Sequence, residues 1–235
     1  SLIERTSGTP QGGVVSPTLA NLYLHYAFDL WMGRDFASIP FERYADDVIC
    51  HCSSKEQASH LRDAIAKRFA ACYLELHPQK TKIAYCKDAR RRGTYSPVQF
   101  DFLGYSFQPR WCRDKEGELF IGFTLAISSK SAKAIRQTMR GWHIHHRSDL
   151  SLEEIARRIN PALRGWINHY GNYRRSALRR VFDALNAFLV RWVMRKYKDL
   201  RGHWMRAQEW VSCAQAREPL LFAHWAMLPN SRLTG

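Results

Sequence analysis

The 235-residue sequence has no apolar run of the roughly 18 to 20 residues that a helix needs to cross a bilayer, so we expect no membrane span. Its six cysteines are irregularly spaced, form no C-x-x-C pair and follow no secretory signal. This usage predicts free thiols in a reducing, cytoplasmic compartment. Apolar residues at 46% and charged residues at 24% exclude wholesale disorder and predict a sizeable folded core.

Acidic side chains are scarce, because 21 Asp and Glu stand against 36 Lys and Arg and leave a net charge of +15. The shortage of acidic side chains differs between the two parts of the chain. Residues 1–127 carry 16 basic and 14 acidic side chains, a balance of +2, whereas residues 128–235 carry 20 and 7, a balance of +13. A large positive net charge favours binding to a polyanion, and nucleic acid is the commonest such partner.

The first part of the chain mixes helix and strand patterns. Helices are predicted at about 16–32, with Ser16 as N-cap and Pro17 in the first helical position, and at about 55–73. The apolar face of the first helix is expected to pack on a sheet; it comprises Leu19, Leu22, Tyr23, Tyr26 and Leu30.

Strand patterns lie between and after these helices. Residues 41–52 predict a tight β-hairpin, because two short aromatic and β-branched runs flank a pair of aspartates. Further strands are predicted at 82–86, 100–107 and 119–125, the last two joined through a turn at 114–117. The predicted class is α+β with a small antiparallel sheet.

From about residue 128 only helical patterns remain. Ser151–Glu154 is a capping box that opens a helix, and Asn160–Pro161 predicts a break followed by a new helix through His169. Further helices are predicted at 176–196 and 203–216. We therefore predict two domains, an α+β domain over 1–127 and an all-α, basic domain over 128–235.

Asp46 and Asp47 place two adjacent carboxylates at the junction of the predicted hairpin. Neighbouring carboxylates repel each other unless a cation neutralises them, and Mg²⁺ prefers such ligands while keeping waters for a phosphate-bearing substrate. Because consecutive strand residues point to opposite faces, one of the two is expected to be the principal ligand. A solvated hairpin turn is the alternative that the pattern leaves open.

Several motifs, in order along the chain, resemble the palm of reverse transcriptases. They are Gly8–Pro17 (GTPQGGVVSP), Tyr44–Asp47 (YADD), Leu76–Lys82 (LHPQKTK) and Phe100–Phe107 (FDFLGYSF). A further segment, Leu163–Tyr173, is similar to the maturase-specific domain, or domain X, of group II intron-encoded proteins. The whole resembles a group II intron-encoded reverse transcriptase and maturase, with part of a palm followed by a helical thumb.

This resemblance implies roles for individual residues. Asp46 would bind two catalytic Mg²⁺ ions with help from Asp47, and Lys80 would neutralise or protonate the leaving pyrophosphate. The implied nucleotide and template pocket consists of Pro10, Gln11, Gly12 and Tyr44. The implied primer grip, which holds the growing 3′ end, consists of Phe102, Leu103 and Gly104.

The basic helical part would be the thumb that grips intron RNA and a duplex of RNA template and DNA primer. Its implied contacts, opposite the apolar stripe of the long helix, are Arg175, Arg179, Arg180, Arg191, Arg195, Lys196 and Lys198. The implied activity is RNA-directed DNA polymerisation from deoxynucleoside triphosphates during retrohoming, together with help in splicing. The implied location is a bacterial, cytoplasmic ribonucleoprotein.

One expected residue has no counterpart in this sequence. Palm polymerases use another aspartate on a strand before the Pro-Gln-Gly loop, and none of the seven residues before Gly8 is an aspartate. We therefore expect the chain to be a piece of a longer enzyme and inactive alone. Two alternatives stay open: an RNA-binding splicing cofactor without polymerase activity, and a domesticated host-defence reverse transcriptase, which the maturase-like segment disfavours.

Overall fold

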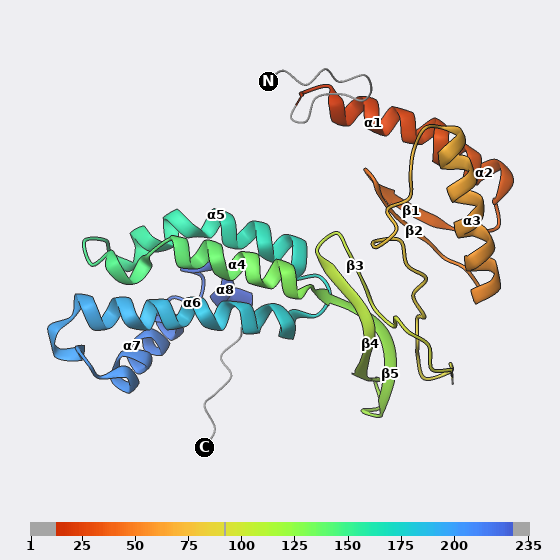
Figure 1. Ribbon diagram of the computed structural model, residues 1–235. Helices are drawn as coiled ribbons and strands as arrows, with labels where there is room; N and C mark the ends of the chain where they lie inside the picture. Colours follow the sequence, from red (N-terminus) through yellow and green to blue (C-terminus); the bar gives the residue numbers. More distant parts are fainter. Residues whose placement is uncertain (1–12, 92, 228–235) are drawn as a thin grey trace. The chain divides into compact units, whose positions relative to one another are not determined.

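The computed structural model describes residues 13–91 and 93–227 (Figure 1). They form two compact units, one up to Tyr85 and the other from Cys86. Each unit combines packed helices with a small antiparallel sheet, which confirms the predicted α+β class. The strands of the described residues form two separate sheets instead of the single one predicted. None of the described helices is both long and apolar enough to span a bilayer.

A continuous helical run opens the first unit. It consists of α1 (Ser16–Leu24), a π-helical segment η1 (His25–Asp29) and α2 (Leu30–Asp35), and it confirms the predicted helix. The predicted N-cap is wrong by one residue. The backbone N–H of Leu19 donates to the carbonyl of Val15 at 3.0 Å, so Val15 is the N-cap and Ser16 is already helical.

The apolar face predicted for this helix does not face the core. All of its members are exposed: Leu19, Leu22, Tyr23, Tyr26 and Leu30. The buried side chains lie further along the run and are Ala27, Phe28, Trp31 and Met32. None of the residues of α1 is fully buried; Leu24 at its end is partly buried against the core of the unit, and the Tyr23 hydroxyl donates to the carbonyl of Cys72.

The predicted hairpin and second helix complete the first unit. Strands β1 (Phe41–Tyr44) and β2 (Asp47–Cys50) pair antiparallel. Ser54 is the N-cap of α3 (Lys55–Ala71), and its hydroxyl accepts a hydrogen bond from the backbone N–H of Gln57 at 3.1 Å. Phe28 meets Phe41 and Phe69 edge to face, with ring centroids 5.2 and 6.0 Å apart. Helical run, hairpin and α3 thus share one core.

Arg43 of β1 ties the hairpin to the helical run. Its Nε and Nη2 donate to the two carboxylate oxygens of Asp29 at 2.7 and 2.6 Å. Its Nη1 donates to Asn21 Oδ1 and to the carbonyl of Ala45, each at 2.9 Å. Hydrogen bonding by Arg43 holds the pKa of Asp29 below its usual range. Bidentate geometry and partial burial make this pair stronger than an ordinary surface ion pair.

The second unit begins with a three-stranded sheet in the order β3 (Phe100–Phe102), β4 (Tyr105–Arg113) and β5 (Leu119–Ile127). The single strand predicted at 100–107 is wrong, because Leu103 and Gly104 adopt φ of 49° and 82° and reverse the chain between β3 and β4. Residues 82–86 are not a strand either. No described strand pairs with them, and β propensity alone does not form a ladder.

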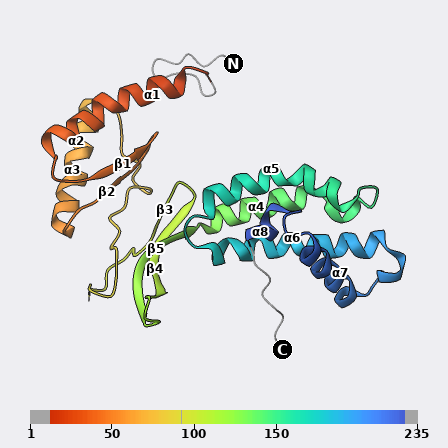
Figure 2. The same cartoon turned by 180° about the vertical axis from the view of Figure 1, so that it is seen from behind.

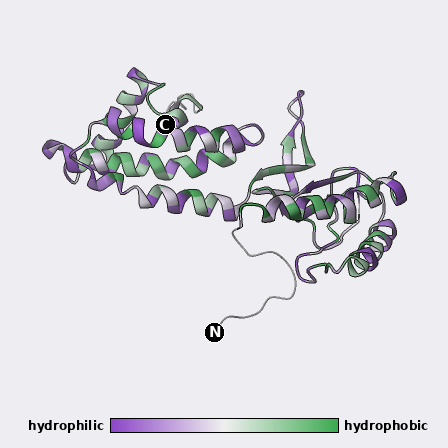
Figure 3. Cartoon of the chain, turned by 90° about the horizontal axis from the view of Figure 1, so that it is seen from above, coloured by the Kyte–Doolittle hydropathy of each residue, from purple (hydrophilic) through white to green (hydrophobic). Residues whose placement is uncertain are grey.

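Helices fill the rest of the second unit. They are α4 (Ser129–Gly141), η2 (Ile144–His146), α5 (Leu152–Tyr170), α6 (Arg175–Lys196), η3 (Lys198–Leu200), α7 (Trp204–Arg217) and α8 (Ala223–Met227). Figures 1 and 2 show α4, α5 and α6 side by side. Figure 3 shows polar and apolar bands alternating along these helices. The predicted helices at 176–196 and 203–216 are confirmed to within one residue, whereas α4 and α8 were not predicted.

Strand gives way to helix between Ile127 and Ser129, at the predicted position. The sheet β3–β5 nevertheless lies in the same compact unit as the helices that follow it. The division into domains 1–127 and 128–235 therefore stays a prediction.

The break predicted at Pro161 is wrong, because α5 continues through it. The capping box at Ser151 is confirmed. Asn160 is buried, and its side chain donates to the carbonyl of Leu221 and accepts from the backbone N–H of Ala223, both at 2.9 Å. These tertiary bonds and the buried face of α5 outweigh the one backbone donor that proline removes.

His224 of α8 is fully buried among the helices. Its Nε2 donates to Asn186 Oδ1 at 2.9 Å, and its Nδ1 has no hydrogen-bond partner in the described part of the chain. Burial lowers the pKa of His224 to about 3. The folded protein therefore holds this imidazole in its neutral form.

The Arg43 ion pair predicts a stability effect in the first unit. Asp29→Asn removes a charge-assisted, bidentate interaction and should lower the free energy of unfolding by about 2 kcal/mol in urea denaturation. Asp35→Asn is the matched control, because Asp35 pairs with Arg34 in an exposed ion pair and should change stability little. Equal effects of the two substitutions would contradict the importance of the Arg43 interaction.

The buried histidine predicts a pH dependence of stability. Between pH 6.5 and about 3 the unfolded chain binds a proton at His224 that the folded chain does not. Stability should therefore fall as pH falls through this window, by up to about 1.4 kcal/mol per pH unit. Urea midpoints measured down this range should fall less steeply for His224→Gln. Parallel slopes for the two proteins would refute the assignment.

Candidate functional site

The two aspartates lie at the tip of the β1–β2 hairpin. Ala45 and Asp46 form the two-residue turn, with a φ of 54° at Ala45, and Asp47 opens β2 opposite Tyr44. Arg43, which also bonds Asp29 of the helical run, donates to the carbonyl of Ala45 and so connects the turn to that run. All four residues from Tyr44 to Asp47 are exposed, so both carboxylates lie on an accessible tip.

The donor set of this tip suits part of a magnesium site. Asp46 and Asp47 offer only carboxylate oxygens, and neither forms an ion pair within residues 13–91 and 93–227. Proteins usually hold Mg²⁺ through one or two carboxylates, while waters and substrate phosphates complete the octahedron. Across the same residues no cluster of three or more His, Cys, Asp or Glu is arranged to hold a metal. The tip can therefore supply part of the ligand set of a Mg²⁺ ion.

Lys80 lies in a turn after α3, in the same unit as the hairpin. The carbonyl of His77 accepts from the backbone N–H groups of Lys80 and Thr81 at 3.2 and 2.9 Å, which shapes the turn. The side chain of Lys80 is exposed, and no described ion pair joins it to Asp46 or Asp47. Pro10, Gln11 and Gly12, the rest of the predicted nucleotide pocket, lie outside the described residues.

The predicted primer grip is the turn between β3 and β4, and it is seated on helices of the second unit. The carbonyl of Gly104 accepts from the backbone N–H of Ser128 at 2.9 Å. A Cβ added to Gly104 would lie 2.6 Å from Tyr170 Oη and 3.0 Å from Ser131 Oγ. The positive φ and this close approach both require glycine at position 104.

An aromatic cluster surrounds the first residue of β4. The Tyr105 ring lies 5.4, 5.3 and 5.5 Å from the rings of His169, Tyr170 and Tyr173, and its hydroxyl donates to the carbonyl of His169. His169 Nε2 also lies 3.3 Å from the carbonyl of Leu103. The cluster joins the predicted primer grip to the segment Leu163–Tyr173. The sequence signal for it was the density of Tyr and His in that segment, but nothing there indicated Tyr105 as the partner.

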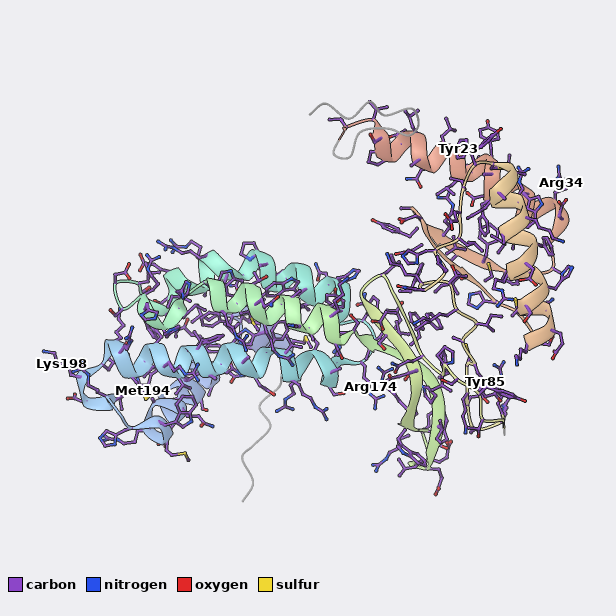
Figure 4. All side chains as sticks on the ribbon, viewed as in Figure 1. Tyr23, Arg34, Tyr85, Arg174, Met194 and Lys198 are labelled. Atoms are coloured by element: carbon purple, nitrogen blue, oxygen red, sulfur yellow. The ribbon has the colours of Figure 1, made fainter. Side chains whose placement is uncertain are left out.

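The predicted RNA-binding side chains of α6 and of the following η3 differ in what they contact. Arg180 and Lys198 are exposed, and Arg175 donates to the carbonyl of Gly171 at 3.3 Å. Figure 4 shows Arg174 and Lys198 at opposite ends of α6, so the basic residues extend over its full length. Arg179 is exposed on the same helix.

Toward the end of α6 two of these residues have partners. Arg195 contacts the ring nitrogen of His146. Lys196 is half-buried; its Nζ donates to the carbonyl of Leu150 at 2.6 Å and lies 5.3 Å from the Trp192 ring. Lys196 was expected on the face opposite the apolar stripe. The structure places it against the core instead, because its ammonium donates to carbonyls of the loop before α5.

The primer-grip turn predicts a second stability effect. Gly117→Ala places alanine at a positive φ in open space and should cost about 1 to 2 kcal/mol in urea denaturation. Gly104→Ala meets the same backbone strain and also the Tyr170 hydroxyl, so it should cost at least about 1 kcal/mol more. Tyr170→Phe should relieve part of that excess. Equal costs at Gly104 and Gly117 would show that the contact with Tyr170 is unimportant.

Two family models match the chain. Reverse transcriptase (RNA-dependent DNA polymerase) matches residues 2–107, which include the hairpin tip, the Lys80 turn and the primer-grip turn. Group II intron, maturase-specific domain matches residues 132–210, from α4 into α7. No curated protein matches the chain. The two domains occur in the order predicted from the motifs, and together they confirm the resemblance. The chain therefore belongs to the reverse transcriptases and maturases encoded by group II introns.

Proposed function

We propose that the chain takes part in RNA-directed DNA synthesis with Asp46 and Asp47 as ligands of the catalytic Mg²⁺ ions. The supporting observation is the hairpin tip, where two exposed carboxylates without ion pairs among the described residues lie within a reverse transcriptase domain. The Arg43 bonds connect the tip to the helical run, and positioning of this kind is what metal-assisted catalysis needs.

When bound, two Mg²⁺ ions would supply Lewis-acid activation of the primer 3′-hydroxyl and neutralise charge on the leaving pyrophosphate. The residues of the chain bind and orient the reactants. Tyr44 is exposed beside the carboxylates and is proposed to contact the incoming nucleotide or the primer end. Pro10, Gln11 and Gly12 are proposed to border the nucleotide and template.

Lys80 is proposed to act on the triphosphate of the incoming deoxynucleotide. An exposed ammonium group offers three hydrogen-bond donors and a positive charge, which neutralises or protonates the pyrophosphate as it leaves. The turn held by His77 presents this side chain away from the core of its unit.

The primer grip is proposed to be the turn formed by Phe102, Leu103 and Gly104. Leu103 is partly exposed at the tip, while Gly104 is packed against Tyr170. A turn held on one side by helices offers a stiff edge against which a primer end can rest. The aromatic cluster around Tyr105 provides that stiffness.

The helical part is proposed to grip the duplex of RNA template and DNA primer and to bind structured intron RNA. The proposed contacts are Arg175, Arg179, Arg180, Arg191, Arg195, Lys196 and Lys198. Residues 128–235 carry 20 basic and 7 acidic side chains, so acidic partners are too few to neutralise the positive charge of this part. Neutralising phosphates with such side chains releases counterions and gives affinity that falls steeply with salt.

RNA binding without polymerisation is the second candidate function. The maturase-specific domain and the balance of +13 over residues 128–235 favour it, because neither feature requires a polymerase site. The two candidates differ in what the hairpin tip does, and they are separated by measuring synthesis and binding on the same preparation.

Substitution of the first aspartate tests the proposal. Asp46→Asn removes a metal-binding charge worth several kcal/mol of transition-state stabilisation, which corresponds to a loss of about 1,000-fold in primer extension. RNA affinity in filter binding should not change, because Asp46 lies outside the basic helical part. Asp63→Asn, an exposed carboxylate on α3, is the matched control and should leave both readouts unchanged.

Extension is measured on the chain itself and on the chain with reverse transcriptase sequence joined ahead of Ser1. RNA binding without any extension in either form would favour the splicing-cofactor function. Full extension by Asp46→Asn would reject the role of Asp46.

A further inference from the structure

A groove of about 210 Å³ lies between α4 and α6, which run side by side in Figure 1. It is lined by Arg136, Arg140, Ala184, Ala187, Phe188 and Arg191. The residues from α4 are one helical turn apart, and those from α6 follow the same spacing over two turns. Both helices therefore turn one continuous face toward the groove.

The lining divides into an apolar floor and a cationic rim. The apolar lining, called the floor here, consists of Ala184, Ala187 and the aromatic ring of Phe188. The rim is formed by the three arginines, which make no ion pair or hydrogen bond among the described residues. Only the ring of Phe188, 5.7 Å beneath the guanidinium of Arg191, contacts one of these charges.

The positive charge around the groove also affects a neighbouring histidine. The imidazole of His145 stacks on Phe188, with ring centroids 6.0 Å apart and planes at 19°. Burial is the main cause that lowers the pKa of His145, and His146, Arg195 and Arg191 lower it further. Three arginines line this one groove without an ion pair among the described residues, so an anion entering the groove is stabilised.

The chemistry of the lining fits a ligand that is aromatic and anionic together. Arginine matches phosphate oxygens bidentately and also stacks on planar rings, while Phe188 offers a face for a base. A groove of about 210 Å³ is of a size that suits a single base. Paired RNA would reach the rim through its phosphates and leave the floor empty.

We propose that the groove between α4 and α6 binds one unpaired nucleotide of RNA. Its base lies against Phe188 and the two alanines, and the adjoining phosphates contact Arg136, Arg140 and Arg191. This site rests on the proposed RNA binding by the helical part and adds to it a preference for RNA with an extruded base. Arg136 and Arg140 had not been singled out by their sequence pattern.

The test compares two RNA hairpins with the same stem, one fully paired and one with a single bulged nucleotide, in equilibrium binding to the full chain. The wild-type chain should bind the bulged hairpin about tenfold more tightly, in line with the stacking energy of one base. With 2-aminopurine at the bulge, binding should quench its fluorescence as the base stacks.

Phe188→Leu keeps an apolar side chain but removes the ring. It should lower the preference for the bulge to near unity and abolish the quenching while leaving affinity for paired RNA unchanged. Arg136→Gln with Arg140→Gln should weaken binding of both hairpins and reduce the salt slope by about two. Arg157→Gln with Arg164→Gln, on the exposed face of α5, is the charge-matched control and should change the slope less. Urea denaturation verifies that each variant is folded.

The outcomes of these binding experiments separate the nucleotide site from the proposed RNA binding of the helical part. Equal binding of the two hairpins by the wild-type chain, or an unchanged bulge preference in Phe188→Leu, overturns the nucleotide site alone. Equal loss of affinity in the α4 pair and the α5 control overturns the role of the groove arginines. A wild-type chain that binds neither hairpin overturns the proposed RNA binding of the helical part together with this site.

Discussion

The interaction between Arg43 and Asp29 is the constraint on which the candidate catalytic tip depends. An exposed ion pair contributes little to stability, but this one is bidentate and partly buried. The same guanidinium bonds the carbonyl of Ala45, immediately before Asp46. A single side chain thus connects the helical run, the hairpin and its turn, so the position of the carboxylates is set by a helix as well as by the strand ladder.

In the second unit a comparable role belongs to contacts between two family motifs far apart in sequence. The primer-grip turn comes from the reverse transcriptase domain, and Tyr170 comes from the maturase-specific domain. They meet at Gly104, where only glycine leaves room for the tyrosine hydroxyl. The part of the palm that would hold a primer is therefore built on the helix that carries the maturase signature, and neither motif is structurally independent of the other.

Much of this fold was predictable because its elements have clear periodicity or local signals. The long stripe of α6, the capping box at Ser151 and the hairpin around Asp46 each depend on residues close in sequence. Failures occurred where distant contacts decide the outcome. Asn160 bonds backbone groups about 60 residues away and supports a helix through Pro161. The carboxylates of the tip were predicted from their pattern, whereas the clamp by Arg43 was not, since no local pattern indicates that Asp29 is its partner.

The π-helical segment η1 has a further consequence for the register of the helical run. An α-helix turns by about 100° per residue, so side chains eight positions apart differ in direction by about 80°. A wider π turn rotates less per residue and brings Asn21 nearer to the direction of Asp29, so one guanidinium reaches both. If His25–Asp29 wound as a regular α-helix with the same number of residues, the offset of about 80° would return and Asn21 would turn away from Arg43. The π turn thus accommodates an extra residue between Asn21 and Asp29 while keeping both within reach of one guanidinium.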